Sequence, residues 1–112
     1  MNRNKYFENW YGTKNSKTID FDEMPQSVEH FYELQMCLKF GVYQRYFLEN
    51  YDLLIYVKPN CDKFTMFIQY CKNKEIVLNT NLNNNNNINS VQEKLIEEAF
   101  KLTKEEFNKT RI

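Results

Sequence analysis

The 112-residue sequence contains only two glycines, two prolines and one histidine. Because Gly12 and Gly41 are its only glycines, it cannot form the glycine-rich loop that holds phosphate in nucleotide-binding proteins. A zinc site would have to combine His30 with all three cysteines, and no two of these form a Cys-x-x-Cys pair. We therefore expect neither a metal nor a cofactor.

Long apolar runs are also absent. No window approaches the roughly 20 consecutive apolar residues that a membrane helix needs. Residues 1–8 lack the apolar core of a secretory signal. Cys37, Cys61 and Cys71 are odd in number and have no scaffold-like spacing, which is typical of free thiols in a reducing compartment. These absences predict a cytoplasmic protein that does not contact membranes.

Aromatic residues are abundant, with nine Phe, eight Tyr and one Trp. Each large ring buries about 150–250 Å², so a core can form although the mean hydropathy is -0.74. The length suits a single domain. Fifteen basic and fifteen acidic residues cancel to a net charge of zero, whereas dedicated nucleic-acid-binding domains are usually basic. The absence of strong charge repulsion is compatible with self-association.

Residues 25–50 carry the clearest helical pattern. Pro25 suits a first helical turn, where its missing N–H needs no partner. Apolar residues then recur at spacings of three and four in two adjoining rows, which predicts a central, mostly buried helix. The rows are Val28, Phe31, Leu34, Leu38 and Val42, and Tyr32, Met36, Tyr43 and Phe47. Gly41 either kinks this helix or admits a neighbouring backbone, and we favour one continuous helix.

Residues 1–24 are expected to form an N-terminal extension. A short helix from Lys5 to Tyr11 should stop at Gly12 and dock Phe7, Trp10 and Tyr11 onto the main body. Residues 13–22 are expected to form a connecting loop.

After residue 50 the apolar period changes from helical to two, which predicts strands. The first strand alternates Leu53, Ile55 and Val57 and ends before Pro59. Residues 59–62 form a turn, residues 64–71 a second strand, residues 72–74 a second turn, and residues 75–79 a shorter third strand. Such an antiparallel meander has one face covered by the helix.

The segment 79–89 holds eight Asn in eleven residues, and we expect a solvated, flexible loop, with an Asn-ladder interaction as the alternative. Ser90 and Glu93 form a capping box that starts the last helix. Its apolar face holds Val91, Leu95 and Ala99. The fold class is therefore α+β, with residues 25–112 forming one α-β-β-β-α domain after the short N-terminal helix.

No residue set suggests catalysis. Cys37 follows His30 by seven residues, about 10 Å along a helix axis, too far for a nucleophile and its base. His30 is expected at the surface and Cys37 in the core. Acidic groups at Asp20, Asp22 and Glu23, and at Glu105 and Glu106, lie in a loop and on a solvated helix end. Acid–base catalysis needs more burial than this, so we predict a protein that is not an enzyme.

The order α-β-β-β-α is that of double-stranded-RNA-binding domains, whose final helix begins with lysines. Here that position carries Glu93, Glu97 and Glu98, which would repel phosphate. Residues 63–70 partly resemble the RNA-stacking strand of RRM domains but lack its glycine. One set of lysine and aromatic residues can still stack single-stranded bases: Tyr56, Lys58, Lys63, Phe67, Lys72 and Lys74.

Two segments carry a resemblance to a known group: Met24-Pro25-Gln26-Ser27 and Gly41-Val42-Tyr43-Gln44-Arg45-Tyr46-Phe47. Over roughly residues 20–108 the chain resembles small phage and prophage proteins of AT-rich, Bacteroidetes-type bacteria. It departs from them in having extra helix before Gly41 and in lacking an arginine- and alanine-rich start to its last helix. The resemblance implies an accessory protein of a mobile element, of the kind that inhibits host defence, as anti-CRISPR proteins do.

Three functions follow as hypotheses. The first is a protein-binding inhibitor of a bacterial defence nuclease, whose partner is a host protein or ribonucleoprotein and whose anchors include Tyr43, Tyr46, Tyr56 and Tyr70. The second is an RNA- or DNA-binding module that uses the lysine-bearing hairpins. The third is a structural or dimerisation domain, in which the third strand or the long helix pairs with a second copy.

Overall fold

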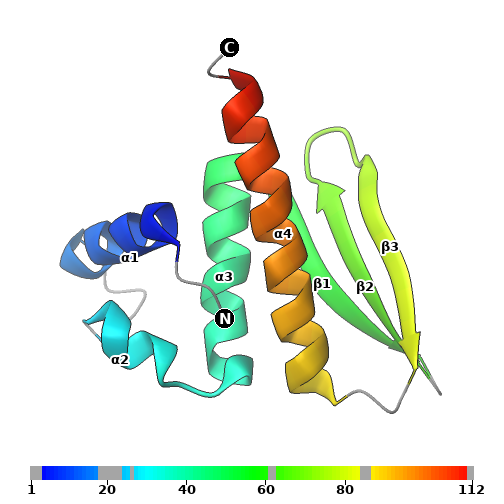
Figure 1. Cartoon of the computed structure of the whole chain (residues 1–112), viewed down its shortest axis with the longest axis horizontal. Coiled ribbons are helices and arrows are strands. Elements are labelled where there is room, and N and C mark those ends of the chain that lie inside the picture. The colour runs from blue at the N-terminus through cyan, green and yellow to red at the C-terminus, as the bar shows by residue number, and fades with distance from the viewer. Residues whose placement is uncertain (1–3, 18–23, 26, 61–62, 84–86, 111–112) are drawn as a thin grey trace.

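The computed structural model describes residues 4–17, 24–25, 27–60, 63–83 and 87–110. The elements follow in the order α1 (Lys5–Lys17), α2 (Val28–Tyr32), α3 (Met36–Tyr51), β1 (Leu53–Asn60), β2 (Lys63–Tyr70), β3 (Ile76–Asn83) and α4 (Ile88–Thr110). The strands form an antiparallel sheet in the order β1-β2-β3, which confirms the α+β class. In Figure 1 the sheet lies on one side of α3 and α4, and α1 and α2 lie on the other side.

The expected long helix is in fact two helices, α2 and α3. Ser27 caps α2 by accepting a hydrogen bond from the backbone N–H of His30, at 3.4 Å. The helix stops after Tyr32, and Phe31 packs against Phe7 and Tyr11 of α1, with ring centroids 5.5 and 4.8 Å apart. The prediction of one continuous helix was therefore wrong. The break could not be read from the sequence, because no glycine or proline marks it.

Several residues of the predicted helix have other roles. Pro25 lies before α2, and its carbonyl accepts a hydrogen bond from the Tyr11 hydroxyl. Helix α3 continues through Gly41, and a side chain there would meet nothing within 4 Å, so this glycine does not admit a neighbouring backbone. Leu38, which was placed in a buried row, is 51% exposed. Within α3 the rows are correct for Met36, Val42, Tyr43 and Phe47, which are buried, and Phe40 is also buried although neither row included it.

Helix α1 is longer than predicted, because it passes through Gly12 and ends at Lys17. Asn4 starts it by accepting a hydrogen bond from the N–H of Phe7, at 2.9 Å. The predicted docking of this segment is confirmed, since Phe7 and Tyr11 are fully buried. Of the predicted loop 13–22, residues 13–17 are helical, and residues 18–22 lie outside the described residues.

The strands run further than the sequence suggested. β1 continues through Pro59, which pairs with Phe64, although the strand was expected to end before it. Proline is tolerated here because β1 lies at the sheet edge, where an N–H is not needed for the ladder. β3 extends to Asn83, so the predicted loop 79–89 is wrong for residues 79–83. Leu78 and Leu82 pack against the core from this strand, and this burial explains why the asparagine-rich segment is extended.

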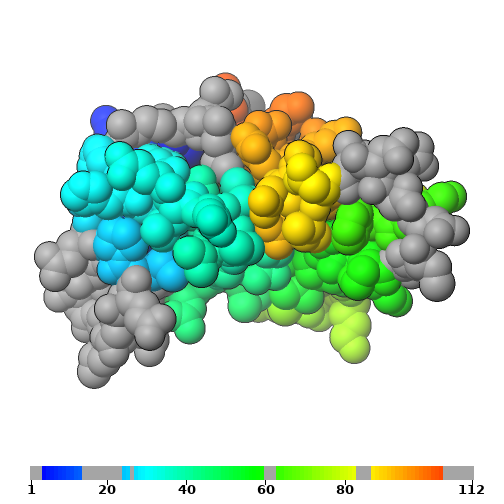
Figure 2. Space-filling view, turned by 90° about the horizontal axis from the view of Figure 1, so that it is seen from below, coloured from blue at the N-terminus to red at the C-terminus, as the bar shows by residue number. Residues whose placement is uncertain are grey.

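Helix α4 begins at Ile88, two residues before the predicted capping box. The Asn87 carboxamide oxygen accepts from the N–H of Ser90 at 2.8 Å, so Asn87 is the cap and Ser90 lies within the first turn. The predicted apolar face is confirmed, with Val91, Leu95 and Ala99 buried. Viewed from below in Figure 2, the first turns of α4 lie between the α2–α3 region (cyan) and the strands (green).

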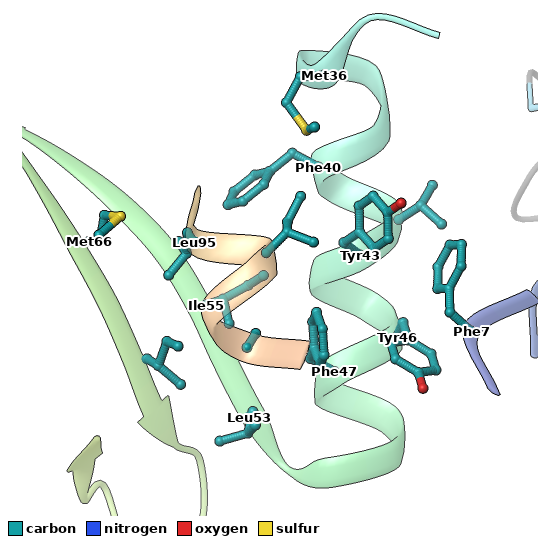
Figure 3. Close-up of a cluster of buried hydrophobic side chains, with 14 of the residues drawn as sticks. Phe7, Met36, Phe40, Tyr43, Tyr46, Phe47, Leu53, Ile55, Met66 and Leu95 are labelled. Carbon is teal, nitrogen blue, oxygen red and sulfur yellow. The ribbon is translucent and has the colours of Figure 1, made fainter. Parts of the chain in front are cut away.

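The core has an aliphatic side and an aromatic side. Between the sheet and the helices it is mainly aliphatic and sulfur-containing, with Ile55, Met66 and Leu95, and Phe40 of α3 also points into it (Figure 3). On the other side of α3 it consists of rings, and Phe7 stacks on Tyr43 with centroids 4.6 Å apart. The helices thus cover one face of the sheet, which we call the inner face. The opposite, outer face carries the alternate residues of each strand.

Candidate binding surface on the outer sheet face

The outer face of the sheet presents a pair of aromatic rings. Tyr56 of β1 lies opposite Phe67 of β2, and both side chains are partly exposed. Their rings are stacked, with centroids 4.8 Å apart and planes inclined by 11°. Their neighbours along the strands, Ile55 and Ile68, are fully buried on the inner face. Successive strand residues point to opposite faces, so this alternation directs both rings away from the helices.

Lys58 and Lys63 lie on the same face, toward the β1–β2 hairpin. Lys58 is opposite Thr65 in the next outward row beyond the ring pair, and Lys63 follows at the start of β2. Both lysine side chains are exposed. Thr65 donates a hydrogen bond to the Asn81 carboxamide oxygen at 2.6 Å, which links β2 to β3 across this face.

Lys72 and Lys74 lie at the other end of the sheet, in the turn between β2 and β3. Asp52, which has a left-handed backbone with φ 57°, ends α3, and its carboxylate accepts from the N–H of Lys72 at 3.1 Å. The Asn73 side chain accepts from the N–H of Glu75 at 2.9 Å. These bonds fix the turn and leave both lysine side chains exposed. The predicted turn is confirmed.

Four of the predicted binding residues therefore lie on the outer face, namely Tyr56, Lys58, Lys63 and Phe67, and Lys72 and Lys74 are exposed in the turn at its far end. The outward residues of the three strands include no carboxylate among those that the structure describes. They include Leu54, Tyr56, Lys58, Lys63, Thr65, Phe67, Gln69, Asn79 and Asn81, and Ile76 lies opposite Gln69 where the register shifts. This surface therefore combines exposed cations with aromatic rings.

Three predicted anchors do not belong to this surface. Tyr43 and Tyr46 are only 1% and 2% exposed, because α1 covers them, and they cannot contact a partner in this structure. Burial raises the pKa of both hydroxyls well above the ordinary tyrosine range, and a hydrogen bond with Tyr51 adds to the rise at Tyr46. Tyr70 lies on the inner face, where it packs against the core.

The two residues weighed as a nucleophile and its base, Cys37 and His30, both lie at the surface. Cys37 is exposed rather than buried as expected, and His30 is exposed as expected. Within the described ranges, no three His, Cys, Asp or Glu side chains are grouped so as to hold a metal ion. The acidic residues 20, 22 and 23, and the side chains of Glu105 and Glu106, lie outside what the structure describes. No described helix is long and apolar enough to cross a membrane.

Sequence reasoning missed Thr65 and Asn81, which stabilise the outer face. The alternation of Leu78, Thr80 and Leu82 between asparagines was the available signal, because it has the period of a strand. Comparisons with protein-family models, curated proteins and solved structures found no match to this chain. The resemblance to phage proteins therefore stays a prediction, and the function is argued from the outer face alone.

Proposed function

We propose that this protein is a non-catalytic binding domain whose outer sheet face holds an extended single-stranded nucleic acid. The observation that carries the proposal is the stacked pair Tyr56–Phe67 beside Lys58 and Lys63. Bases stack on exposed aromatic rings, and lysines attract the phosphates that join those bases. Neither kind of contact depends on base sequence.

The arrangement of the lysines supports a linear path along β2. Lys63 begins this strand, Phe67 lies in its middle, and Lys72 follows its end. The eight residues of β2 correspond to about 26 Å, and known single-strand binders cover about 4–16 nucleotides per domain. A strand laid along β2 would meet a cation at each end and the two rings between them.

The zero net charge of the chain is compatible with this proposal. Many exposed acidic residues, such as Glu29, Glu33 and Glu97, lie on or next to the helices, and Glu75 lies in the β2–β3 turn. The outer face instead carries lysine. Phosphate binding depends on the local concentration of cations as well as on total charge, so a neutral protein can still present a basic surface.

The test is fluorescence anisotropy of labelled oligothymidylate and oligouridylate with the full chain. The double variant Lys58→Gln/Lys63→Gln should weaken binding. It should also lower the slope of log affinity against log salt by about 1.4, since each lost single-strand phosphate contact contributes about 0.7. Replacing Tyr56 by Leu should weaken binding by about tenfold or more at every salt concentration, because stacking is worth about 1–3 kcal/mol per base.

The matched control is Lys94→Gln/Lys104→Gln, which removes the same charge from exposed positions of α4. This variant should bind nearly as well as the natural chain. Equal weakening by both double variants would show that binding follows total charge and would contradict a site on the outer face. Absence of binding even at about 50 mM salt would overturn the proposal.

The second candidate is a protein-binding domain, such as an inhibitor of a host defence nuclease. Ile76 and Val77, beside the outer face at the start of β3, are 53% and 37% exposed. Apolar and aromatic side chains with charged residues at the margin are typical of protein interfaces. A protein partner should stay bound through high salt and be lost on replacing Ile76 by Lys, whereas nucleic acid should be released by salt.

A further inference from the structure

The two edges of the sheet differ in how well they are protected. At the β1 edge, the Gln44 side chain of α3 donates a hydrogen bond to the Ile55 carbonyl at 2.8 Å. Pro59 of the same strand has no N–H to offer, and Lys58 adds a charge. Side chains that bond to an edge, prolines and lysines all prevent a further strand from adding. The β1 edge is therefore closed to pairing.

The β3 edge has none of these protections. Among the described residues, β3 pairs only with β2, and the segment Ile76–Asn83 contains neither a charged residue nor a proline. The register shift between Ile68 and Gln69 affects only its start, and residues 78–83 pair regularly. Helix α4 packs against β1 and β2, and in Figure 1 β3 forms the outer margin of the sheet. An unprotected edge of this length is a template for another strand.

The sequence of this edge indicates what would pair with it. Residues 78–82 read Leu-Asn-Thr-Asn-Leu, which is the same in both directions. Two copies joined antiparallel about a two-fold axis at Thr80 would place Thr80 opposite itself. Asn79 would then face Asn81, and Leu78 would face Leu82. Residues directly opposite share a face of the sheet, and Thr–Thr and apolar pairs stabilise it.

We propose that β3 pairs with β3 of a second copy of this chain, in the register centred on Thr80. The occupant is a second copy because a two-fold interface must be self-complementary, and a palindromic strand satisfies this condition at every position. Charge does not oppose the association, since the strand is uncharged and the net charge is zero. The pairing joins two sheets into one and places both Tyr56–Phe67 pairs on a continuous outer face. The inference does not rest on the proposed function.

The experiment measures the mass of the full chain by sedimentation equilibrium from micromolar to millimolar concentration. The natural chain should have twice the mass of one 13.7 kDa chain at the upper end of this range. Asn79→Lys/Asn81→Lys puts like charges opposite each other twice and should weaken the dimer about tenfold or more. Asn79→Lys/Asn81→Glu puts opposite charges together in the same register and should keep the dimer.

These two variants alter the same exposed positions and both replace Asn81, whose carboxamide oxygen accepts from Thr65, so each is compared with the other. Far-UV circular dichroism should show that both are folded. A natural chain that stays monomeric at millimolar concentration would overturn the proposal. This holds even if the β3 edge were then found to bind an unrelated extended peptide. Equal dimer strength in the two variants would also overturn it, because the register would then be wrong.

Discussion

Two stacked aromatic pairs in this protein have similar geometry and opposite surroundings. Phe7 and Tyr43 stack at 4.6 Å in the core, and Tyr56 and Phe67 stack at 4.8 Å on the outer sheet face. The first pair is covered by α1, α2 and α4, whereas the second is partly exposed. Ring stacking by itself therefore does not distinguish a core from a binding surface. The distinction lies in which elements cover the rings.

The largest expected effect on stability comes from a substitution in the buried pair Phe7–Tyr43. Replacing Phe7 by Ala should lower the free energy of unfolding by about 3–5 kcal/mol, because it leaves a cavity against Tyr43, Tyr46 and Phe31. Urea unfolding followed by circular dichroism measures this loss. A loss below about 1 kcal/mol would mean that α1 does not seal the aromatic core.

The next largest expected effect is a loss of stability at alkaline pH, which arises from the buried hydroxyls of Tyr43 and Tyr46. Their pKa values are raised in the folded chain, so the unfolded chain loses its tyrosine protons first, near pH 10. Stability should then fall as pH rises above this value, by up to about 1.4 kcal/mol per pH unit for each buried tyrosine. The Tyr46→Phe variant should show a shallower fall in urea unfolding between about pH 9 and pH 11. Equal slopes would contradict burial of that hydroxyl.

The smallest expected effect on stability is at the exposed pair. Replacing Phe67 by Leu keeps apolar contact with the sheet and should cost about 1 kcal/mol or less, the value of one aromatic pair. The same change at Phe7 removes a fully buried ring and should cost more. Phe67→Leu should nevertheless weaken oligonucleotide binding about fivefold or more, as measured by anisotropy. A variant that loses stability but keeps its affinity would place Phe67 with the core.

Local pattern predicted some elements well. The alternation in residues 53–57 and 64–70 gave β1 and β2 and their inward residues, since burial on one face enforces a period of two. The last helix was found from its apolar face, although Asn87 and not Ser90 caps it. Both residues are good caps.

Other features followed from contacts distant in the sequence. The break between α2 and α3 has no local marker, and it coincides with the packing of Phe31 on α1. The asparagine-rich strand was taken for a loop because asparagine usually favours loops, and the packing of Leu78 and Leu82 overrides that preference. For the candidate site, the sequence identified four exposed lysines and the rings of Tyr56 and Phe67. It could not show that Tyr43, Tyr46 and Tyr70 face the core whereas Tyr56 is on the outer face.

The sequence by itself determined an α+β domain with a three-stranded antiparallel meander, because periods of 3.6 and 2 are written in the spacing of apolar residues. It also determined the palindrome in β3. The tertiary structure alone decided which aromatic rings are exposed. Tyr43 is covered by Phe7, which lies 36 residues earlier in the chain, and the rings of Tyr56 and Phe67 lie on the sheet face opposite to the buried Ile55 and Ile68. The exposure of a ring depends on which distant segments cover it. The spacing of residues along the chain does not encode such long-range contacts.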